Sequence, residues 1–159
     1  MNKNYSKTFE AKTENLEQIS IYLDNILKKI RINKEIREEI LIAVDEAATN
    51  IIMHSYKGKE GGKIRVNINV NNDKIEISLF DNGQTFDPSK IKEPIFTNEL
   101  DTRKIGGLGI FLMKKFMDEV TFYLKNTNLR NENEVRMVKY LKKNSKEVLN
   151  GFKNKKSGK

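Results

Sequence analysis

The segment Asn33–Ser55, NKEIREEILIAVDEAATNIIMHS, has the pattern of a long core helix. Its apolar residues recur at intervals of four, four, four and three, which is the spacing of one buried face of an α-helix. These residues are Ile36, Ile40, Val44, Ala48 and Ile51. Asn33 stands just before the pattern and belongs to the residue types that cap helix N-termini. The sequence therefore predicts a helix that begins at Asn33 and runs to Ser55.

Three polar residues follow one edge of this predicted helix. Glu46, Asn50 and His54 are spaced four residues apart, so their side chains form a stripe that borders the apolar face. The simplest interpretation is a solvated helix edge. A carboxylate, an amide and the only histidine of the chain are also groups that can hold a ligand, and the helix alone does not decide between the two interpretations.

Periodic patterns on both sides of this helix predict the remaining elements. They are a strand at 5–12, a helix at 13–30, strands at 63–71 and 74–80, a helix at 108–118, and strands at 119–125 and 134–141. Asn72 and Asp73 are turn residues that join the two middle strands in a hairpin, and Thr13 or Asn15 is expected to cap the first helix. This order predicts an α+β fold, a two-layer sandwich with a mixed, largely antiparallel sheet and helices on one face.

Composition limits the class of protein. With 159 residues, of which 37% are hydrophobic, the chain suits one core rather than two, and one domain is expected over residues 1–141. No run approaches the roughly 18 apolar residues of a membrane helix, and the first residues lack the apolar core of a signal peptide, so a cytoplasmic location is expected. Without cysteine there are no disulfides, thiol nucleophiles or cysteine metal sites.

The net charge of +8 is concentrated at the C-terminal end of the chain. Residues 142–159 contain seven lysines and one glutamate, a net charge of +6, which leaves +2 for the first 141 residues. A segment of this composition is expected to be a basic, solvated tail without fixed structure. Nucleic-acid contact is an alternative for this tail alone and is not expected of the folded domain.

Residues 81–107 form a stretch of 27 residues without clear periodicity, which is long for a loop in a small domain, and a glycine-containing motif lies at each end of it. Asp81 ends a predicted strand and Gly83 follows, in a sequence that suits either a plain turn or a ligand contact. Gly106, Gly107 and Gly109 lie at the start of an apolar helix, where glycines allow close backbone approach and the helix terminus favours phosphate. These glycines match neither a P-loop nor a dinucleotide motif.

Together, the three motifs resemble the ATP site of the GHKL superfamily, which includes gyrase, heat-shock chaperone, histidine kinase and mismatch-repair ATPases. They are Glu-x3-Asn on a core helix, Asp-x-Gly at a strand end and Gly-Gly-x-Gly at a helix start, within residues 8–141. EAATNIIMHSY, DNGQTFDP and GGLGIFLMKKFMDEV are most similar to the bacterial anti-sigma-factor serine kinases. Thr85 and Phe86 replace a second glycine of the wider superfamily. NENEV replaces a glycine-threonine pair before the last strand, where Asn133 is the candidate substitute for a phosphate contact.

The resemblance implies a role for each motif residue. Asn50 would be a ligand of Mg²⁺, a cation that prefers oxygen donors. Glu46 would accept the proton of the attacking hydroxyl or orient it, and His54 would lie toward the phosphates. Asp81 would accept a hydrogen bond from the adenine amino group, which a guanine carbonyl cannot donate. Gly83 would leave room for the base.

The resemblance also implies contacts around the triphosphate. Backbone N–H groups at the start of the last helix would bind the phosphates, and a loop from about 89 to 105 would close over them as a lid. The further nucleotide-binding candidates are Phe86, Thr97, Arg103, Lys104, Gly106, Gly107, Leu108 and Gly109. For Arg103 and Lys104, a solvated pair of loop cations is an alternative interpretation.

These implications predict a serine/threonine protein kinase that uses ATP and Mg²⁺ and is also an anti-sigma factor. It would form a homodimer, bind a sigma factor and phosphorylate a serine of an anti-anti-sigma protein of the STAS type. Two other functions fit the same motifs: a detached histidine-kinase catalytic domain that acts in trans, and an ATP-gated protein-binding module without kinase activity. No membrane partner is expected.

Overall fold

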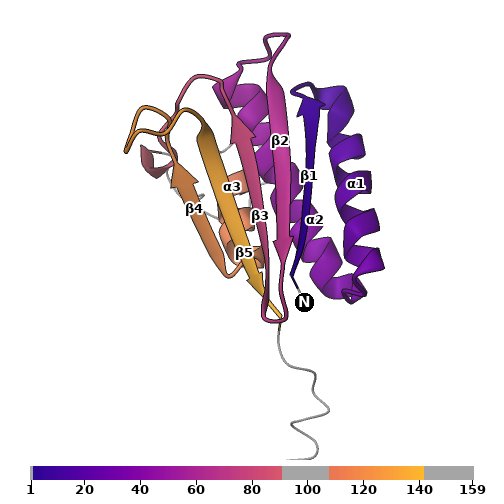
Figure 1. Ribbon diagram of the computed structural model, residues 1–159. Coiled ribbons are helices and arrows are strands. Elements are labelled where there is room, and N and C mark those ends of the chain that lie inside the picture. The colour runs from indigo at the N-terminus through magenta and orange to yellow at the C-terminus, as the bar shows by residue number, and fades with distance from the viewer. Residues whose placement is uncertain (1, 91–107, 142–159) are drawn as a thin grey trace, which may run out of the picture.

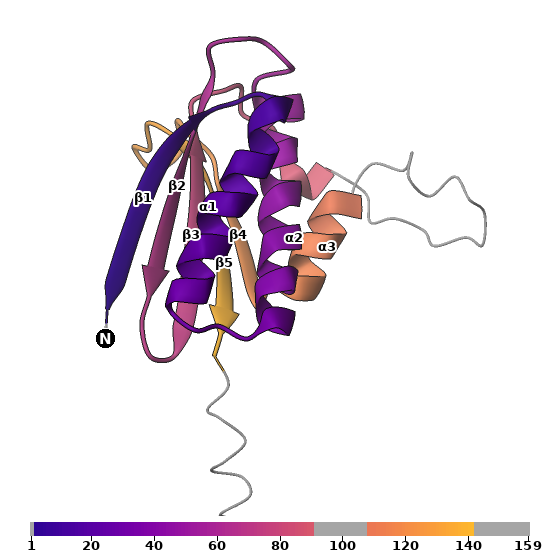
Figure 2. The same ribbon diagram turned by 90° about the vertical axis from the view of Figure 1, so that its right-hand side faces the viewer.

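The computed structural model describes residues 2–90 and 108–141, which form one sheet with helices on one of its faces (Figures 1 and 2). The strands are β1 (Lys3–Glu10), β2 (Lys63–Val70), β3 (Lys74–Asp81), β4 (Glu119–Tyr123) and β5 (Asn133–Tyr140), and the α-helices are α1 (Leu16–Lys29), α2 (Lys34–Asn50) and α3 (Leu108–Phe116). The predicted two-layer α+β fold is confirmed. The predicted tail at 142–159 lies outside the described residues.

The sheet order is β1-β2-β3-β5-β4, and each neighbouring pair of described strands is antiparallel. The expectation of a mixed sheet is therefore corrected to an antiparallel one. β3 and β4 run in the same direction and would form a parallel pair as neighbours, but β5 lies between them. Because of this order, Asp81 at the end of β3 is paired with Asn133 at the start of β5.

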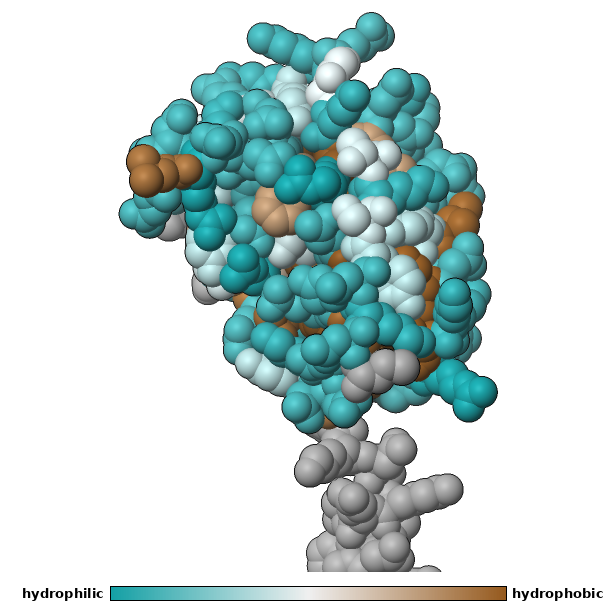
Figure 3. All heavy atoms as spheres, viewed as in Figure 1, coloured by the Kyte–Doolittle hydropathy of each residue, from teal (hydrophilic) through white to brown (hydrophobic). Residues whose placement is uncertain are grey.

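Side-chain alternation explains why the helices cover a single face of the sheet. In β2 and β3 every second residue is buried, and these residues are Ile64, Val66, Ile68, Ile75, Ile77 and Leu79. α2 packs in the middle of the helical layer, where the buried Ala43 and Ala47 allow the helix to lie close to the sheet. The open face is mainly hydrophilic (Figure 3). None of the described helices is long and apolar enough to span a membrane.

The sequence predicted the N-terminal cap of α2 correctly and that of α1 incorrectly. Asn33 caps α2, since its side-chain oxygen accepts a hydrogen bond from the Ile36 N–H at 2.9 Å. The predicted cap of α1 is wrong, because Thr13–Asn15 forms a 3₁₀ turn that leads directly into the helix. Asn15 already has helical backbone angles, and its side chain donates to the Glu10 carbonyl instead of capping.

The chain remains helical beyond Asn50, the last residue of α2. Residues Ile51–Ser55 continue it as a π-helical turn, in which the Tyr56 N–H donates to the Ile51 carbonyl. π turns are rare and frequently lie at functional sites. The helix predicted to reach Ser55 is therefore present, but its last turn is wider and points its side chains in directions that α-helical spacing does not give.

A buried carboxylate joins three strands on the open face of the sheet. The Glu134 side chain is 2% exposed and accepts hydrogen bonds from Ser78 at 2.8 Å and from Arg130 and Arg136 at 2.9 Å each. Both guanidinium groups also lie against the Tyr123 ring, at 3.9 and 4.9 Å from its centroid. This cluster fixes the start of β5 relative to β3 and β4.

Replacing Glu134 with glutamine is expected to lower the free energy of unfolding by about 2 kcal/mol at pH 7, because two arginines lose a buried anion. Burial acts to raise the pKa of Glu134, but the hydrogen bonds from Ser78, Arg130 and Arg136 outweigh it, so the folded pKa is lowered. The stabilisation is therefore complete above the unfolded pKa and is lost as the pH falls through the folded value. Denaturant unfolding of both proteins across this acid range measures the difference.

Glu38→Gln is the control for this experiment, because Glu38 pairs with Lys34 in an exposed position on α2. Exposed pairs of this kind contribute little, so no measurable change in stability is expected. An equal loss in the two variants, or a Glu134→Gln difference that does not decrease as the pH falls below the ordinary glutamate pKa, would contradict the assignment of a buried, charged Glu134.

Candidate functional site

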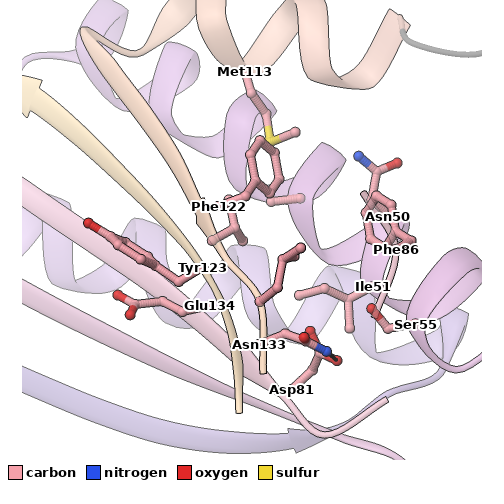
Figure 4. A pocket seen from close by; sticks show the side chains of 13 residues that line it. Asn50, Ile51, Ser55, Asp81, Phe86, Met113, Phe122, Tyr123, Asn133 and Glu134 are labelled. Atoms are coloured by element: carbon pink, nitrogen blue, oxygen red, sulfur yellow. Dashed lines mark hydrogen bonds between the residues drawn. The ribbon is translucent and has the colours of Figure 1, made fainter. Parts of the chain in front are cut away.

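A pocket lies between the helical layer and the ends of β3, β4 and β5 (Figure 4). About 380 Å³ of space unoccupied by protein atoms lies between its lining residues, and part of this space is open to solvent. Its lining is mostly apolar, with a few polar groups directed into it, as is usual for small-molecule sites. The lining residues are Ala47, Asn50, Ile51, Ser55, Asp81, Phe86, Met113, Phe122, Tyr123, Leu124, Asn133, Glu134 and Val135.

Asp81 is the buried acid of this pocket, with 4% of its surface exposed. One of its carboxylate oxygens accepts hydrogen bonds from the Gly83 N–H at 2.9 Å and from the Asn133 side-chain amide at 3.0 Å. Burial raises the pKa of the Asp81 carboxyl, while the bonds from Asn133, Gly83 and Ser55 oppose the rise. A carboxylate can accept about four hydrogen bonds, so these three donors leave capacity for one from a ligand.

The turn after β3 packs directly on the π turn that extends α2. A β-carbon on Gly83 would lie 2.5 Å from the Ser55 carbonyl oxygen, so this close approach requires glycine. The same carbonyl accepts a hydrogen bond from the Gln84 N–H at 2.6 Å, and the Tyr56 hydroxyl accepts one from the Asn82 N–H at 3.0 Å. The position of Asp81 is thus fixed by contacts to the helix as well as to the sheet.

The catalytic and metal-binding candidates on α2 lie against the start of α3. A β-carbon on Gly109 would lie 2.7 Å from a Glu46 carboxylate oxygen and 3.6 Å from the Asn50 amide atoms. The structure therefore brings Glu46, Asn50 and Gly109 together, although Gly109 comes 59 residues after Asn50 in the sequence. Burial, followed by the charge of Asp45, raises the pKa of Glu46, as suits a group that accepts a proton. Asn50 also lines the pocket.

His54 and Phe86 form an aromatic contact at the pocket. Their ring centroids are 5.3 Å apart with a tilt of 44°, and of the two only Phe86 lines the pocket. Glu46, Asn50 and His54 were expected to form one stripe at α-helical spacing. His54 lies in the π turn, so it does not continue the α-helical spacing of the other two. Leu108 is the first residue of α3 and is half-buried. The other predicted contacts, Thr97, Arg103, Lys104, Gly106 and Gly107, lie outside the described residues.

Several lining residues were not predicted from the sequence as base contacts. Ser55 was considered only as a helix end, and Asn133 only as a substitute contact to phosphate. Phe122 and Leu124 belong to a strand pattern that does not indicate which of its residues face a cavity. The signal for Asn133 was the unusual NENEV sequence at the start of the last strand, but the sequence could not show that it lies opposite Asp81.

Comparison with known proteins agrees with this architecture. The sequence matches the family described as the histidine kinase-like ATPase domain over residues 9–139. It is 37% identical over 117 residues to the serine-protein kinase RsbW of Listeria innocua, which covers 71% of this chain and 74% of that protein. It is 35% identical over 138 residues to the serine-protein kinase RsbW of Staphylococcus epidermidis, which covers 84% of each.

The fold is also similar to a crystal structure of RsbU and RsbW domains from Mycobacterium tuberculosis, with a TM-score of 0.61. That match covers 86% of this chain and 32% of the other at 14% sequence identity, so it is evidence for the fold alone. The family match and the identity to two RsbW proteins confirm the resemblance to the GHKL superfamily. The chain belongs to the histidine kinase-like ATPase family, among the relatives of the RsbW serine-protein kinases.

Proposed function

We propose that the protein is an ATP-dependent serine-protein kinase whose nucleotide occupies the pocket at the end of β3. The observation that carries this proposal is the buried, partly satisfied Asp81 carboxylate in an otherwise apolar pocket. The exocyclic amino group of adenine would supply the missing donor, and the planar base would lie between apolar side chains such as Ile51 and Leu124. A guanine base carries a carbonyl at that position and would leave the carboxylate opposed by an acceptor.

The triphosphate would extend from this base site toward Asn50 and the start of α3. Helix N-termini favour phosphate through free N–H groups and the helix dipole. The Asn50 amide oxygen is a hard donor at this position and would hold Mg²⁺, which usually takes most of its ligands from water and phosphate. When bound, the ion would neutralise charge on the triphosphate and orient its terminal phosphate.

Glu46 lies one helical turn before Asn50 and would act on the attacking serine. The serine hydroxyl oxygen forms a bond to the terminal phosphorus, the bond to the ADP oxygen breaks, and the hydroxyl proton passes to Glu46. The raised pKa of Glu46, which follows first from burial and then from the charge of Asp45, supports this assignment. The predicted lid contacts Thr97, Arg103 and Lys104, and the predicted nucleotide contacts Gly106 and Gly107 at the start of α3, remain proposals for the same triphosphate.

The biological partners of this activity are proposed from the family. The relatives are named serine-protein kinase, and the sequence resembles the anti-sigma-factor kinases. We therefore infer a cytoplasmic homodimer that binds a sigma factor and phosphorylates a serine of a STAS-type antagonist. A histidine-kinase activity in trans differs chemically, because phosphohistidine is lost in acid and phosphoserine is retained.

Replacing Asp81 with asparagine is expected to abolish selective stabilisation by ATP. Wild type should gain unfolding temperature with Mg-ATP and none with Mg-GTP, whereas the variant should gain from neither. Without nucleotide, the variant should unfold at or above the wild-type temperature, because it no longer buries a carboxylate whose pKa burial raises. Thermal-shift measurements give both values, and a variant that still prefers ATP would rule out base recognition by Asp81.

Replacing Asn50 with alanine is expected to remove the dependence of ATP binding on Mg²⁺. In the wild type, chelation of Mg²⁺ by EDTA should weaken ATP binding about tenfold or more, while the variant should bind weakly with or without the ion. Isothermal titration calorimetry measures both affinities. Asn25→Ala, an exposed asparagine of α1, is the control and should behave as wild type. A full Mg²⁺ response in Asn50→Ala would contradict the assignment.

Replacing Glu46 with glutamine is expected to reduce phosphoryl transfer by a factor of about 10² or more and to leave ATP affinity within a few-fold of wild type. The measurement uses labelled ATP and a purified STAS-type protein, with the serine-to-alanine form of that protein as the control. The product should survive acid. Acid-labile label would favour the histidine-kinase alternative, and absence of transfer by the wild type with ATP bound would favour the ATP-gated module.

A further inference from the structure

We propose that Asn133 is a positioning residue that orients the Asp81 carboxylate and keeps it charged for the base, an inference that rests on the proposed nucleotide site. Asn133 begins β5, directly opposite Asp81 in the antiparallel pair with β3, and is 7% exposed. Figure 4 shows the two side chains next to one another in the pocket. A buried amide at this position is therefore placed by the sheet register itself.

All four hydrogen-bonding sites of the Asn133 amide are used. Its NH₂ group donates to Asp81 at 3.0 Å and to the Gly83 carbonyl at 3.2 Å. Its oxygen accepts from the Lys125 N–H and from the Thr85 hydroxyl, each at 3.0 Å. One side chain thus joins the end of β3, the turn after it, the segment after β4 and the start of β5.

These partners also determine which way the amide faces. The Lys125 backbone N–H can only donate, and the Gly83 carbonyl can only accept. A flipped amide would place its oxygen against the Asp81 carboxylate and the Gly83 carbonyl and its NH₂ group against the Lys125 N–H, so three of the four bonds would be lost; only the Thr85 hydroxyl could change from donor to acceptor. The NH₂ group therefore points at Asp81, because only this orientation satisfies both Lys125 and Gly83.

A neutral donor has a specific advantage in this position. A lysine or arginine opposite Asp81 would form an ion pair and satisfy the carboxylate, whereas an amide stabilises the charged form and leaves the full negative charge in place. The nearby cation, Lys125, directs its ammonium group to the Asn82 carbonyl at 3.0 Å. The bonds from Asn133 and Gly83 occupy one oxygen of Asp81, so the carboxylate plane is fixed before a base arrives.

Asn133→Asp tests this role because it keeps the shape and replaces the NH₂ donor with a carboxylate. At pH 8 the variant should bind ATP at least tenfold more weakly than wild type, because two adjacent carboxylates repel one another. Near pH 5.5 the pair should share one proton, because like charges at this distance raise the pKa of one partner. The introduced carboxyl then donates to Asp81 as the amide did, so the affinity of the variant should rise, while that of the wild type should not.

Asn131→Asp is the matched control, since it adds the same charge two residues earlier at an exposed position. It should bind ATP as wild type does at both pH values. Weak binding by Asn133→Asp at both pH values would indicate a purely structural role and overturn the proposal. Wild-type affinity of this variant at pH 8 would overturn it as well.

A second measurement separates this proposal from the proposed function. Carbon-13 NMR titration of the Asp81 carboxyl in the nucleotide-free protein needs no ATP. Removal of the donor in Asn133→Leu should move the Asp81 titration to higher pH than in wild type, and an unchanged titration would refute the proposal. If the wild type bound no ATP, the proposed function would fail, and the titration would still decide whether Asn133 controls Asp81.

Discussion

The contact between Gly83 and the main chain of Ser55 is the constraint on which the pocket depends. It brings the turn after β3 against the extension of α2 with no side chain between them. The layer that carries Asp81 and the helix that carries Glu46 and Asn50 are thereby held at a fixed separation. In the proposed function, base recognition at Asp81 and phosphate chemistry at Glu46 and Asn50 would lie at opposite ends of the bound nucleotide, so this separation would have to match its length. A larger residue at position 83 would disturb both ends at once.

The buried Asp81 carboxylate lowers the stability of the protein without ligand. A carboxylate buried at the end of a strand loses hydration, and the donors around Asp81 compensate only in part, since burial still raises its pKa. If the proposed nucleotide binds here, its amino group would donate one more hydrogen bond to Asp81 and offset part of this desolvation cost on binding. Glu134 is the contrasting case, because three neighbours satisfy it and its pKa is lowered. The buried acid of β5 therefore stabilises the sheet, whereas the buried acid of β3 is the one that the proposed function assigns to ligand binding.

The sequence predicted those features that depend on periodicity and on local chemistry. Asn33 was predicted as a helix cap, and the hairpin of β2 and β3 followed from alternation and two turn residues. The pairing of Glu46 with Gly109 could be expected only through the family resemblance, because 62 intervening residues separate them. The π turn, the position of His54 and the cap error at Asn15 were not predictable, since each depends on tertiary packing that overrides local spacing. The place of β5 between β3 and β4 likewise comes from the packing of the whole sheet.

The start of β5 shows how a departure from a family pattern can be understood from hydrogen-bonding capacity. A threonine hydroxyl has one donor, whereas the Asn133 amide has two donors and two acceptor sites, and all four are used here. Side chains alternate along a strand, so the Asn133 side chain faces the pocket, while Glu134, which borders the pocket, directs its carboxylate to Ser78, Arg130 and Arg136 on the open side of the sheet. Two consecutive residues therefore anchor the same backbone on both faces. Because both residues are anchored, the start of β5 has little conformational freedom. This rigidity allows the neutral Asn133 amide to hold the buried Asp81 carboxylate in one orientation without an ion pair.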